Sequence, residues 1–401
     1  MEIDNPYDVN SAELIVGIPS YNEADNISFV VEKCNEGLRK YFPNYKSVII
    51  NVDNNSPDDT RSVFLNSVNT IPKIYISTPL NVKGKGNNFY NLFKESVRLR
   101  AKVIVVVDAD ITSITPEWIP EMINPIIKDR FDFVTPLYSR NEYDGTITNN
   151  ICYPLIMGIM GKDIRQPIGG DFALSNTLGK YILDQTWHDT TRQYGIDIFL
   201  TLNAIIGNFR TCQVELGAKI HKPSAPKLGS MFTQVVGTMF ETVLQHKNSW
   251  NNLIEVEELP LYGKNKFAEP QKLSVDYKTM KEIAISEFIN NQEILVKYLS
   301  SEIYCDLCKM FNSGKIDINM DLWTMLIYDL LYAYDISVDR VEIIEAMKPL
   351  YFGRVITFYR ETLDMDHYAC EVRIQQQSRH FFNSRNYLIN KYEDSRSFSV
   401  N

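Results

Sequence analysis

Short apolar runs alternate with amphipathic stretches over the first part of the chain. Leu14 to Pro19, Ser47 to Val52 and Val103 to Val107 are apolar runs that each end in a polar loop, which is typical of strands. Between the first two, one face of a predicted helix carries Ile27, Val30, Val31, Cys34 and Leu38. Continuous β-branched runs indicate strands that are buried on both faces. The pattern therefore predicts an α/β fold with a mostly parallel sheet and helices above and below it.

Beyond about residue 230 the pattern changes to long amphipathic helices. Ile283 to Leu299 fits one helix, and Leu322 to Leu331 fits another. We therefore expect a catalytic domain over residues 1–260 and an α-helical C-terminal domain over residues 261–401. The apolar faces of this second domain favour packing and assembly into a homo-oligomer over a direct part in chemistry.

Charge and composition exclude several classes of protein. The formal net charge of −9 repels phosphate backbones, so no nucleic acid is expected as a partner. The acidic N-terminus is unlike a signal peptide, and no apolar run is long enough to span a bilayer, so we expect a cytoplasmic protein without a membrane partner. The pair Cys305 and Cys308 is more consistent with two ordinary thiols than with a metal or redox site, since no second pair completes it.

Polar clusters follow three of the predicted strands directly. They cover Pro19 to Glu23, Asp53 to Asp58 and Asp108 to Asp110. In a parallel α/β sheet, ligands bind at the carboxyl ends of the strands. Two acids as close as Asp108 and Asp110 raise each other's energy and favour a cation, and Mg²⁺ or Mn²⁺ bridging a diphosphate is the natural partner. The alternative is a pair of acids that merely solvates a turn.

Two further segments suit a nucleotide sugar. Asp53 to Asp58 offers carboxylate and amide groups for a base or ribose, although the same residues can form an Asx-turn and a helix cap, and both can be true. Lys83-Gly84-Lys85-Gly86 offers close backbone approach and a lysine that can reach a phosphate. Its spacing is not that of a P-loop.

These motifs, in this order, resemble the GT-A glycosyltransferases. More narrowly, the segments Asp108 to Ser113 and Pro116 to Ile119 resemble mannosylglycerate synthase. The segments Gln166 to Asp171 and Tyr194 to Asp197 resemble both that family and the glucosyl-3-phosphoglycerate synthases. The resemblance runs from about residue 14 to about residue 235. It implies a hexosyltransferase that uses a GDP-, UDP- or ADP-hexose and retains the anomeric configuration.

The resemblance also implies roles for individual residues. Glu23 and Asp53 would hold the nucleotide, and Asp110 with His221 would ligate the metal. Lys85 would act on the donor phosphates, and Asp197 would position hydroxyls near the reaction centre. Further substrate contacts are expected from Pro19, Tyr21, Asp108, Ala109 and Ile168.

For the acceptor, the resemblance implies Arg140, Asp144 and Thr148, with Gly169 and Gly170 allowing close backbone approach. Arginine can hold a carboxylate with two parallel hydrogen bonds. Residues 144–148 contain no cation that could pair a phosphate, which favours D-glycerate over 3-phosphoglycerate; Arg165 is the nearby cation that could change this. The loop after His221, residues 222–227, departs from the mannosylglycerate synthase pattern, which leaves the identity of the sugar and nucleotide open.

Two other classes remain as alternatives. A nucleotidyltransferase also uses paired acids and a metal, but usually has a glycine-rich basic loop after its first strand, where this chain has Pro19 to Glu23. A non-catalytic nucleotide-sugar sensor would keep Asp53 without needing Asp110, His221 and Asp197 together.

Overall fold

The computed structural model describes residues 2–67, 70–222, 228–247, 250, 253–263, 268–271, 273 and 275–398. The chain forms two compact units, each assembled from three separate stretches. Unit 1 comprises residues 1–140, 165–227 and 259–271, and unit 2 comprises residues 141–164, 228–258 and 272–401. This division differs from the single boundary predicted at residue 260, because two earlier stretches of chain pack with the C-terminal helices. That the two units serve as a catalytic and a helical domain stays a prediction.

Unit 1 contains a nine-stranded sheet in the order β1-β4-β3-β2-β5-β8-β6-β9-β11 among the described residues. Neighbouring strands are parallel except where β1 meets β4 and where β8 lies between β5 and β6. The strands are β1 (Glu2–Asp4), β2 (Leu14–Ser20), β3 (Ser47–Asp53), β4 (Lys73–Ser77), β5 (Val103–Val106), β6 (Phe133–Ser139), β8 (Phe172–Ser175), β9 (Thr211–Ala218) and β11 (Leu261–Tyr262). The predicted mostly parallel α/β sheet is confirmed.

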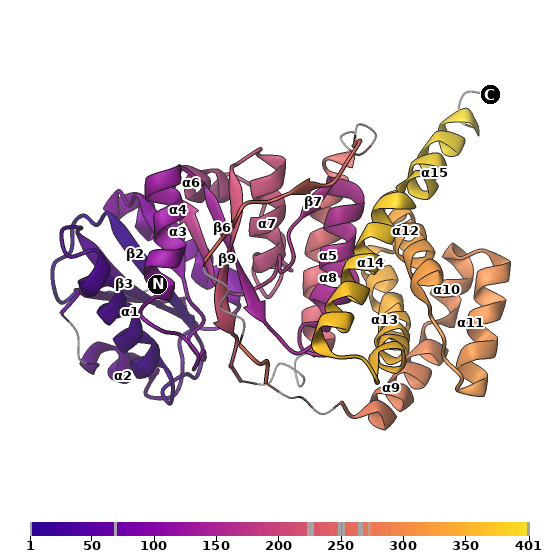
Figure 1. Ribbon diagram of the computed structural model, residues 1–401, viewed down its shortest axis with the longest axis horizontal. Coiled ribbons are helices and arrows are strands. Elements are labelled where there is room, and N and C mark those ends of the chain that lie inside the picture. Colours follow the sequence, from indigo (N-terminus) through magenta and orange to yellow (C-terminus); the bar gives the residue numbers. More distant parts are fainter. Residues whose placement is uncertain are drawn as a thin grey trace. The chain divides into compact units, whose positions relative to one another are not determined.

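Helices cover both faces of this sheet (Figure 1). Val103 and Val105 of β5 pack into one core with α1 (Ile27–Tyr41) and α4 (Trp118–Asp129). Ile104 and Val106 pack into a second core with α3 (Lys85–Leu99), α6 (Asn176–Leu183) and α7 (Ile196–Ile206). The short helix α2 (Thr60–Asn66) follows β3. Burial on both faces explains the continuous apolar run of β5, as expected from the sequence.

Unit 2 is mainly helical. Its elements are the π-helices η1 (Thr148–Cys152) and η2 (Ile156–Met160), the strands β7 (Lys162–Asp163) and β10 (Glu257–Glu258), and the helices α5 (Tyr153–Leu155), α8 (Leu228–Leu244), α9 (Tyr277–Asn290), α10 (Gln292–Tyr298), α11 (Ser301–Ser313), α12 (Met320–Ile336), α13 (Arg340–Thr362), α14 (His367–Asn383) and α15 (Arg385–Phe398). Among the described residues, no helix combines the length and the apolar character needed to cross a membrane.

One helix predicted in this unit is wrong. Residues 283–299 form two helices, α9 and α10, which are separated at Asn291. The backbone of Asn291 has φ −111° and ψ 11°, outside the helical range, and asparagine favours such helix ends. Ile283 and Ile289, which the periodic pattern had assigned to a buried face, are 43% and 56% exposed. Cys305 and Cys308 lie on α11 as free thiols.

Candidate active site

The predicted polar clusters meet at one edge of the sheet in unit 1. Parallel pairing brings Ser20 opposite Asp53 at the ends of β2 and β3, and Gly17 opposite Val106 in β2 and β5. The loops that follow these three strands are therefore neighbours. This is the edge at which ligands bind in parallel α/β sheets.

Asp53 lies at the end of β3 and is fully buried. Its Oδ1 accepts hydrogen bonds from the hydroxyls of Ser20 (2.6 Å) and Ser56 (2.7 Å). Its Oδ2 accepts from the Ser56 backbone N–H (2.6 Å) and the Tyr75 hydroxyl (3.0 Å). The bond from Ser56 N–H is the Asx-turn that the sequence suggested. A direct contact between Asp53 and a nucleotide stays a prediction, and it requires one of these four bonds to be exchanged.

Five charged side chains from strand ends and helix starts form an alternating chain, in the order Asp197, Lys85, Asp108, Lys219, Asp171. Lys85 Nζ lies 3.2 Å from Asp197 and 3.0 Å from Asp108 Oδ1. Lys219 Nζ lies 3.1 Å from Asp108 Oδ2 and 3.0 Å from Asp171 Oδ2. Asp171 also accepts from the Asp108 backbone N–H (2.8 Å) and the Tyr138 hydroxyl (2.5 Å). We call these five residues the charged chain.

The pairings in the charged chain decide the protonation of its members. Burial disfavours the ammonium of Lys85, but the charges of Asp108 and Asp197 outweigh this and raise its pKa. Burial likewise opposes ionisation of Asp108, but Lys85 and Lys219 outweigh it and lower its pKa. The pKa of Asp197 is raised, because burial dominates over the single lysine beside it. Lys85, Lys219 and Asp108 are therefore firmly ionised.

Glycines allow the backbone to reach this arrangement. Gly170 has φ +89°, and a Cβ there would lie 2.3 Å from Asp108 Oδ2. Gly84 has φ +127° directly before Lys85, the first residue of α3, and a Cβ on Gly86 would lie 2.0 Å from the Thr191 carbonyl oxygen. Asp197 lies in the first turn of α7. Gly170 thus lets the backbone lie against Asp108, and its approach to a substrate stays a prediction.

Asp110 and His221 each lie two residues beyond a member of the charged chain, Asp108 and Lys219, and both are half-buried. Ile220 ties the two loops together, because its carbonyl accepts from Thr112 N–H (2.9 Å) and its N–H donates to Ser113 Oγ (3.0 Å). Burial and then the charge of Asp108 raise the pKa of Asp110, and His221 is close enough to oppose this electrostatically. No three His, Cys, Asp or Glu side chains of the described residues cluster as a metal site. Mg²⁺ often takes one or two protein ligands and completes its shell with phosphate and water, and this pair fits that need.

Other residues expected to contact the substrates come from the end of β2 and the loop after it, from the loop after β5 and from the segment before β8. Glu23 accepts from Lys222 Nζ at 2.7 Å. Burial raises the pKa of Glu23, and nearby Asp110 adds to this. Tyr21 is exposed, and its hydroxyl accepts from Lys83 at 2.5 Å. Pro19 and Ala109 are buried, and Ile168 is half-buried. Residues 223–227, where the sequence departs from the mannosylglycerate synthase pattern, lie outside the described residues.

The residues expected to bind the acceptor divide between the two units. Arg140, directly after β6 in unit 1, is close enough to Lys219 for its charge to counter the rise in the pKa of that lysine. Asp144 and Thr148 belong to unit 2, where Thr148 is buried at the start of η1. Their joint role in binding stays a prediction.

Lys219 and Asp171 are two members of the charged chain that were not identified from the sequence. Lys219 is 7% exposed and also donates to the Gly169 carbonyl at 2.7 Å, and Asp171 is fully buried. Asp171 directly follows Gly169 and Gly170, so the acid after the glycine pair was an available signal. Lys219 offered none, because a lysine two residues before a histidine is unremarkable until β9 places it beside β6.

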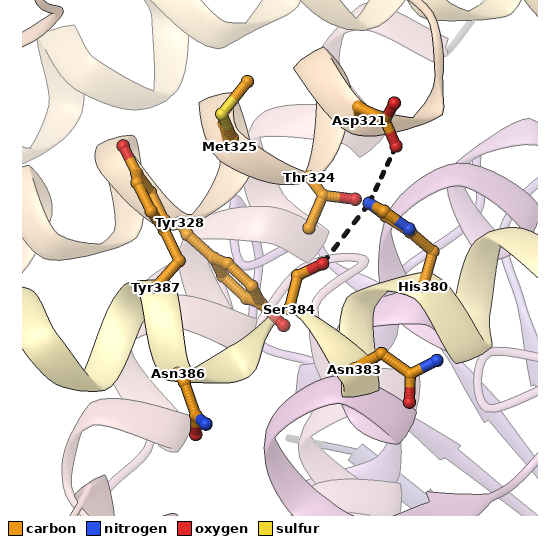
Figure 2. Close-up of a pocket in the computed structure, with 9 residues that line it drawn as sticks. All are labelled: Asp321, Thr324, Met325, Tyr328, His380, Asn383, Ser384, Asn386 and Tyr387. Carbon is orange, nitrogen blue, oxygen red and sulfur yellow. Dashed lines mark hydrogen bonds and ion pairs between the residues drawn. The ribbon is translucent and has the colours of Figure 1, made fainter.

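A separate pocket of about 370 Å³ lies in unit 2 (Figure 2). There His380 Nε2 lies 3.1 Å from Asp321 Oδ1 and 3.3 Å from Ser384 Oγ. A Ser-His-Asp relay uses the two different ring nitrogens, whereas both partners here face Nε2. The side chain of Asp321 is also 73% exposed. The arrangement is therefore not a hydrolytic triad, and none of the residues expected from the sequence lines the pocket.

Residues 15–187 match the model of glycosyl transferase family 2. The glucosyl-3-phosphoglycerate synthase of Mycolicibacterium paratuberculosis is 26% identical over 250 residues, which cover 56% of this chain and 70% of that protein. A crystal structure of the glucosyl-3-phosphoglycerate synthase of Mycobacterium tuberculosis, in complex with Mn²⁺, UDP and phosphoglyceric acid, matches with a TM-score of 0.47. That match has 21% identity and covers 58% of this chain and 78% of the other. A second structure of the same enzyme, with Mg²⁺ and UDP, gives the same TM-score and 21% identity over 58% of this chain and 79% of the other.

The family match spans β2 to α6 and so contains Lys85, Asp108 and Asp110 at the edge of the sheet. Its extent agrees with the part of the chain in which strands alternate with helices. Residues 15–187 match a glycosyl transferase family 2 domain, so this part of the chain is similar to glycosyltransferases, and its mostly parallel sheet agrees with the GT-A fold expected from the sequence.

Proposed function

We propose that the protein is a retaining hexosyltransferase that moves glucose or mannose from a nucleotide sugar to D-glycerate. One observation carries this proposal. In the charged chain the two lysines are paired with Asp108 and its neighbours, while Asp110, two residues after Asp108, lies close enough to Asp108 and His221 to feel both charges. A carboxylate in that position favours a cation, and a donor diphosphate would bring one.

A divalent cation, Mg²⁺ or Mn²⁺, held by Asp110 and His221 would neutralise charge on the donor diphosphate. The relatives named above include structures with these ions and UDP, which supports the choice. Asp108 and Asp197 accept from Lys85, and an ammonium has three N–H donors. We therefore expect Lys85 to direct its third donor to a phosphate oxygen and offset the charge of the leaving group.

Asp197 is assigned to orienting a substrate hydroxyl. Its Oδ1 is buried and has no hydrogen-bond donor in the described part of the chain, although it lies 3.2 Å from Lys85 Nζ. The contact with Lys85 lacks the geometry of a hydrogen bond to this oxygen, and a hydroxyl of the sugar or of the acceptor would donate one. The raised pKa of Asp197 also suits a group that meets a neutral hydroxyl.

The acceptor distinguishes two related activities. D-glycerate needs one cation for its carboxylate, for which we propose Arg140, and we propose Asp144 and Thr148 as further acceptor contacts. The alternative is 3-phosphoglycerate, which the name of the curated relative favours. Asp144 would repel the phosphate of that acceptor, which is why we propose glycerate. We further expect a cytoplasmic homo-oligomer.

A screen of nucleotide hexoses against D-glycerate, 3-phosphoglycerate and lactate, with Mg²⁺ or Mn²⁺, tests the proposal. Release of the nucleoside diphosphate with D-glycerate is the expected result, and the anomeric configuration of the product tests retention. A higher kcat/KM for 3-phosphoglycerate would overturn the choice of acceptor. Arg140→Ala should raise the KM for glycerate far more than the KM for the donor, because the lost contact is to the acceptor carboxylate.

A further inference from the structure

The segment that contains Asp144 and Thr148 is built into the helical unit in an unusual way. It continues into the π-helix η1 (Thr148–Cys152). Such π-helical turns are rare in proteins, and those that occur often lie at functional sites. Pro154 follows η1 and has no N–H. It can therefore donate neither to the carbonyl of Asn150, four residues before it, nor to the carbonyl of Asn149, five residues before it.

Side chains from two other helices of unit 2 donate to these two carbonyls. Gln377 Nε2 of α14 donates to the Asn149 carbonyl at 3.0 Å. Trp323 Nε1 of α12 donates to the Asn150 carbonyl at 2.7 Å. Both side chains are 1% exposed, so water does not compete for these bonds. The two carbonyls that cannot accept from Pro154 thus accept from side chains of other helices.

The orientation of the Gln377 amide is itself fixed. Arg354 Nε donates to Gln377 Oε1 at 2.8 Å, so the NH₂ group of that amide must face Asn149. Arg354 is fully buried and pairs with both oxygens of Glu361, at 2.9 Å and 3.1 Å. The arginine is thereby held by two fork bonds and cannot release the amide at little cost.

We propose that Gln377, oriented by Arg354, is a positioning residue for the acceptor. It fixes the backbone of residues 146–150, and with it the side chain of Thr148. This inference rests on the proposed function, which assigns Asp144 and Thr148 to the acceptor. It gives the helical unit a part in substrate recognition besides packing.

Two variants weaken the support without emptying the core. Gln377→Glu keeps an acceptor for Arg354 and removes the donor to Asn149, and Trp323→Phe removes the donor to Asn150 while keeping an aromatic ring. The matched control is Phe311→Leu, which alters a buried stacked pair of α9 and α11, Phe288 and Phe311, and so destabilises the same unit elsewhere. The KM for each substrate, kcat, the thermal midpoint and amide hydrogen exchange of residues 146–153 are measured for all three.

We expect both variants to raise the KM for the acceptor about tenfold, the factor that corresponds to a lost buried hydrogen bond, while the KM for the donor stays unchanged. Hydrogen exchange in residues 146–153 should rise in both variants and stay unchanged in Phe311→Leu at a similar loss of thermal midpoint. The inference is overturned if the acceptor KM is unchanged, or if the control raises it equally. If the wild type transfers hexose to neither glycerate nor 3-phosphoglycerate, the proposed function fails, and hydrogen exchange alone then decides whether Gln377 positions the segment.

Discussion

The ends of β3 and β5 both place carboxylates at the same edge of the sheet, but they satisfy them differently. At the end of β3, Asp53 is surrounded by four neutral donors from Ser20, Ser56 and Tyr75. At the end of β5, Asp108 is held by the cations Lys85 and Lys219, and Asp110 lies just beyond them. The carboxylate of Asp53 has its hydrogen-bond donors within the protein, whereas the pair Asp108 and Asp110 still favours an added cation.

This difference favours a part in shaping the loop for Asp53 and a part in binding for the acids after β5, and both roles stay predictions. Neutral groups of the protein donate four hydrogen bonds to the carboxylate of Asp53 and stabilise its negative charge. These bonds occupy the lone pairs that a ligand would otherwise meet. The charged chain consists of three acids and two lysines, and Asp110 adds a further negative charge beside it. A sequence pattern of acids after strands cannot distinguish these two cases, because the lysines that pair with Asp108 come from distant segments.

The largest effect is expected from Asp110→Asn. If the end of β5 binds the metal, this variant should lose about 100- to 1000-fold in kcat, the range for the loss of one preorganised electrostatic contact, with little change in the free energy of unfolding. Steady-state kinetics with Mg²⁺ and urea titration provide the two measurements. EDTA should silence the wild type, and added Mg²⁺ or Mn²⁺ should restore it.

The matched control is Asp59→Asn, which removes one exposed negative charge near the end of β3. It should leave kcat unchanged. Near-normal turnover of Asp110→Asn with metal present would remove the metal-centred mechanism and with it the contrast between the two strand ends.

Lys219→Met tests whether the charged chain holds the end of β5 together. The variant leaves Asp171 buried without its cation, and breaking a buried ion pair from one side typically costs about 3–5 kcal/mol of folding free energy. Urea unfolding at neutral pH measures this. A loss below about 1 kcal/mol, the range of exposed pairs, would show that Lys219 contributes little.

The same variant should also change acid unfolding. Burial opposes ionisation of Asp108, but Lys85 and Lys219 lower its pKa, so its contribution to stability is present above the unfolded pKa and is lost as the pH falls through the folded pKa. Without Lys219 the folded pKa rises toward the unfolded one. The midpoint of acid unfolding should therefore move to higher pH, as followed by circular dichroism.

Asp53→Asn should act mainly on stability. The amide keeps one acceptor but presents an NH₂ group to two of the present donors, which costs about 1–3 kcal/mol for buried groups left unsatisfied. The donor KM separates the two views of this residue. A rise in the donor KM without loss of stability would show that Asp53 contacts the nucleotide directly. The ends of β3 and β5 would then both bind the donor.

The smallest effect is expected from Lys102→Met. Lys102 is 63% exposed and pairs with Glu13 at 2.7 Å in the same unit. Because solvent and salt screen such a pair, the variant should have the same urea midpoint as the wild type. This should hold at low and at high salt. A clear loss of stability in this variant would mean that exposure is a poor guide to the strength of ion pairs in this protein.

Much of the fold of unit 1 could be predicted, because its strands are short, continuous apolar runs. The predicted strand from Ser47 to Val52 falls one residue short of β3. The long helices were harder, since their apolar spacing continues through Asn291 although the backbone does not. The interleaving of the two units could not be predicted, because the helical character of residues 148–160 and 228–244 does not say which helices they pack with.

The candidate site was predictable only in part, for a related reason. Lys85, Asp108, Asp110 and Asp197 were identified from local motifs and a resemblance, and the first, second and fourth lie within the charged chain. Lys219 depends on the pairing of β9 with β6, which no local pattern reveals. Long-range pairing thus supplies the counter-charges that local motifs lack.

The interleaved course of the chain has a consequence for how the protein is made. Strand β11, which completes the order of the sheet in unit 1, is synthesised only after residues 228–258 of unit 2 have been added to the chain. Unit 2 in turn receives its earliest stretch, residues 141–164, long before the helices that support it. During translation the carbonyls of Asn149 and Asn150 therefore receive their donors only after Trp323 and Gln377 have been synthesised. The segment assigned to the acceptor is thus among the last parts to become rigid. Nascent chains arrested before residue 377 should already hold nucleotide sites in unit 1 but lack a rigid acceptor segment.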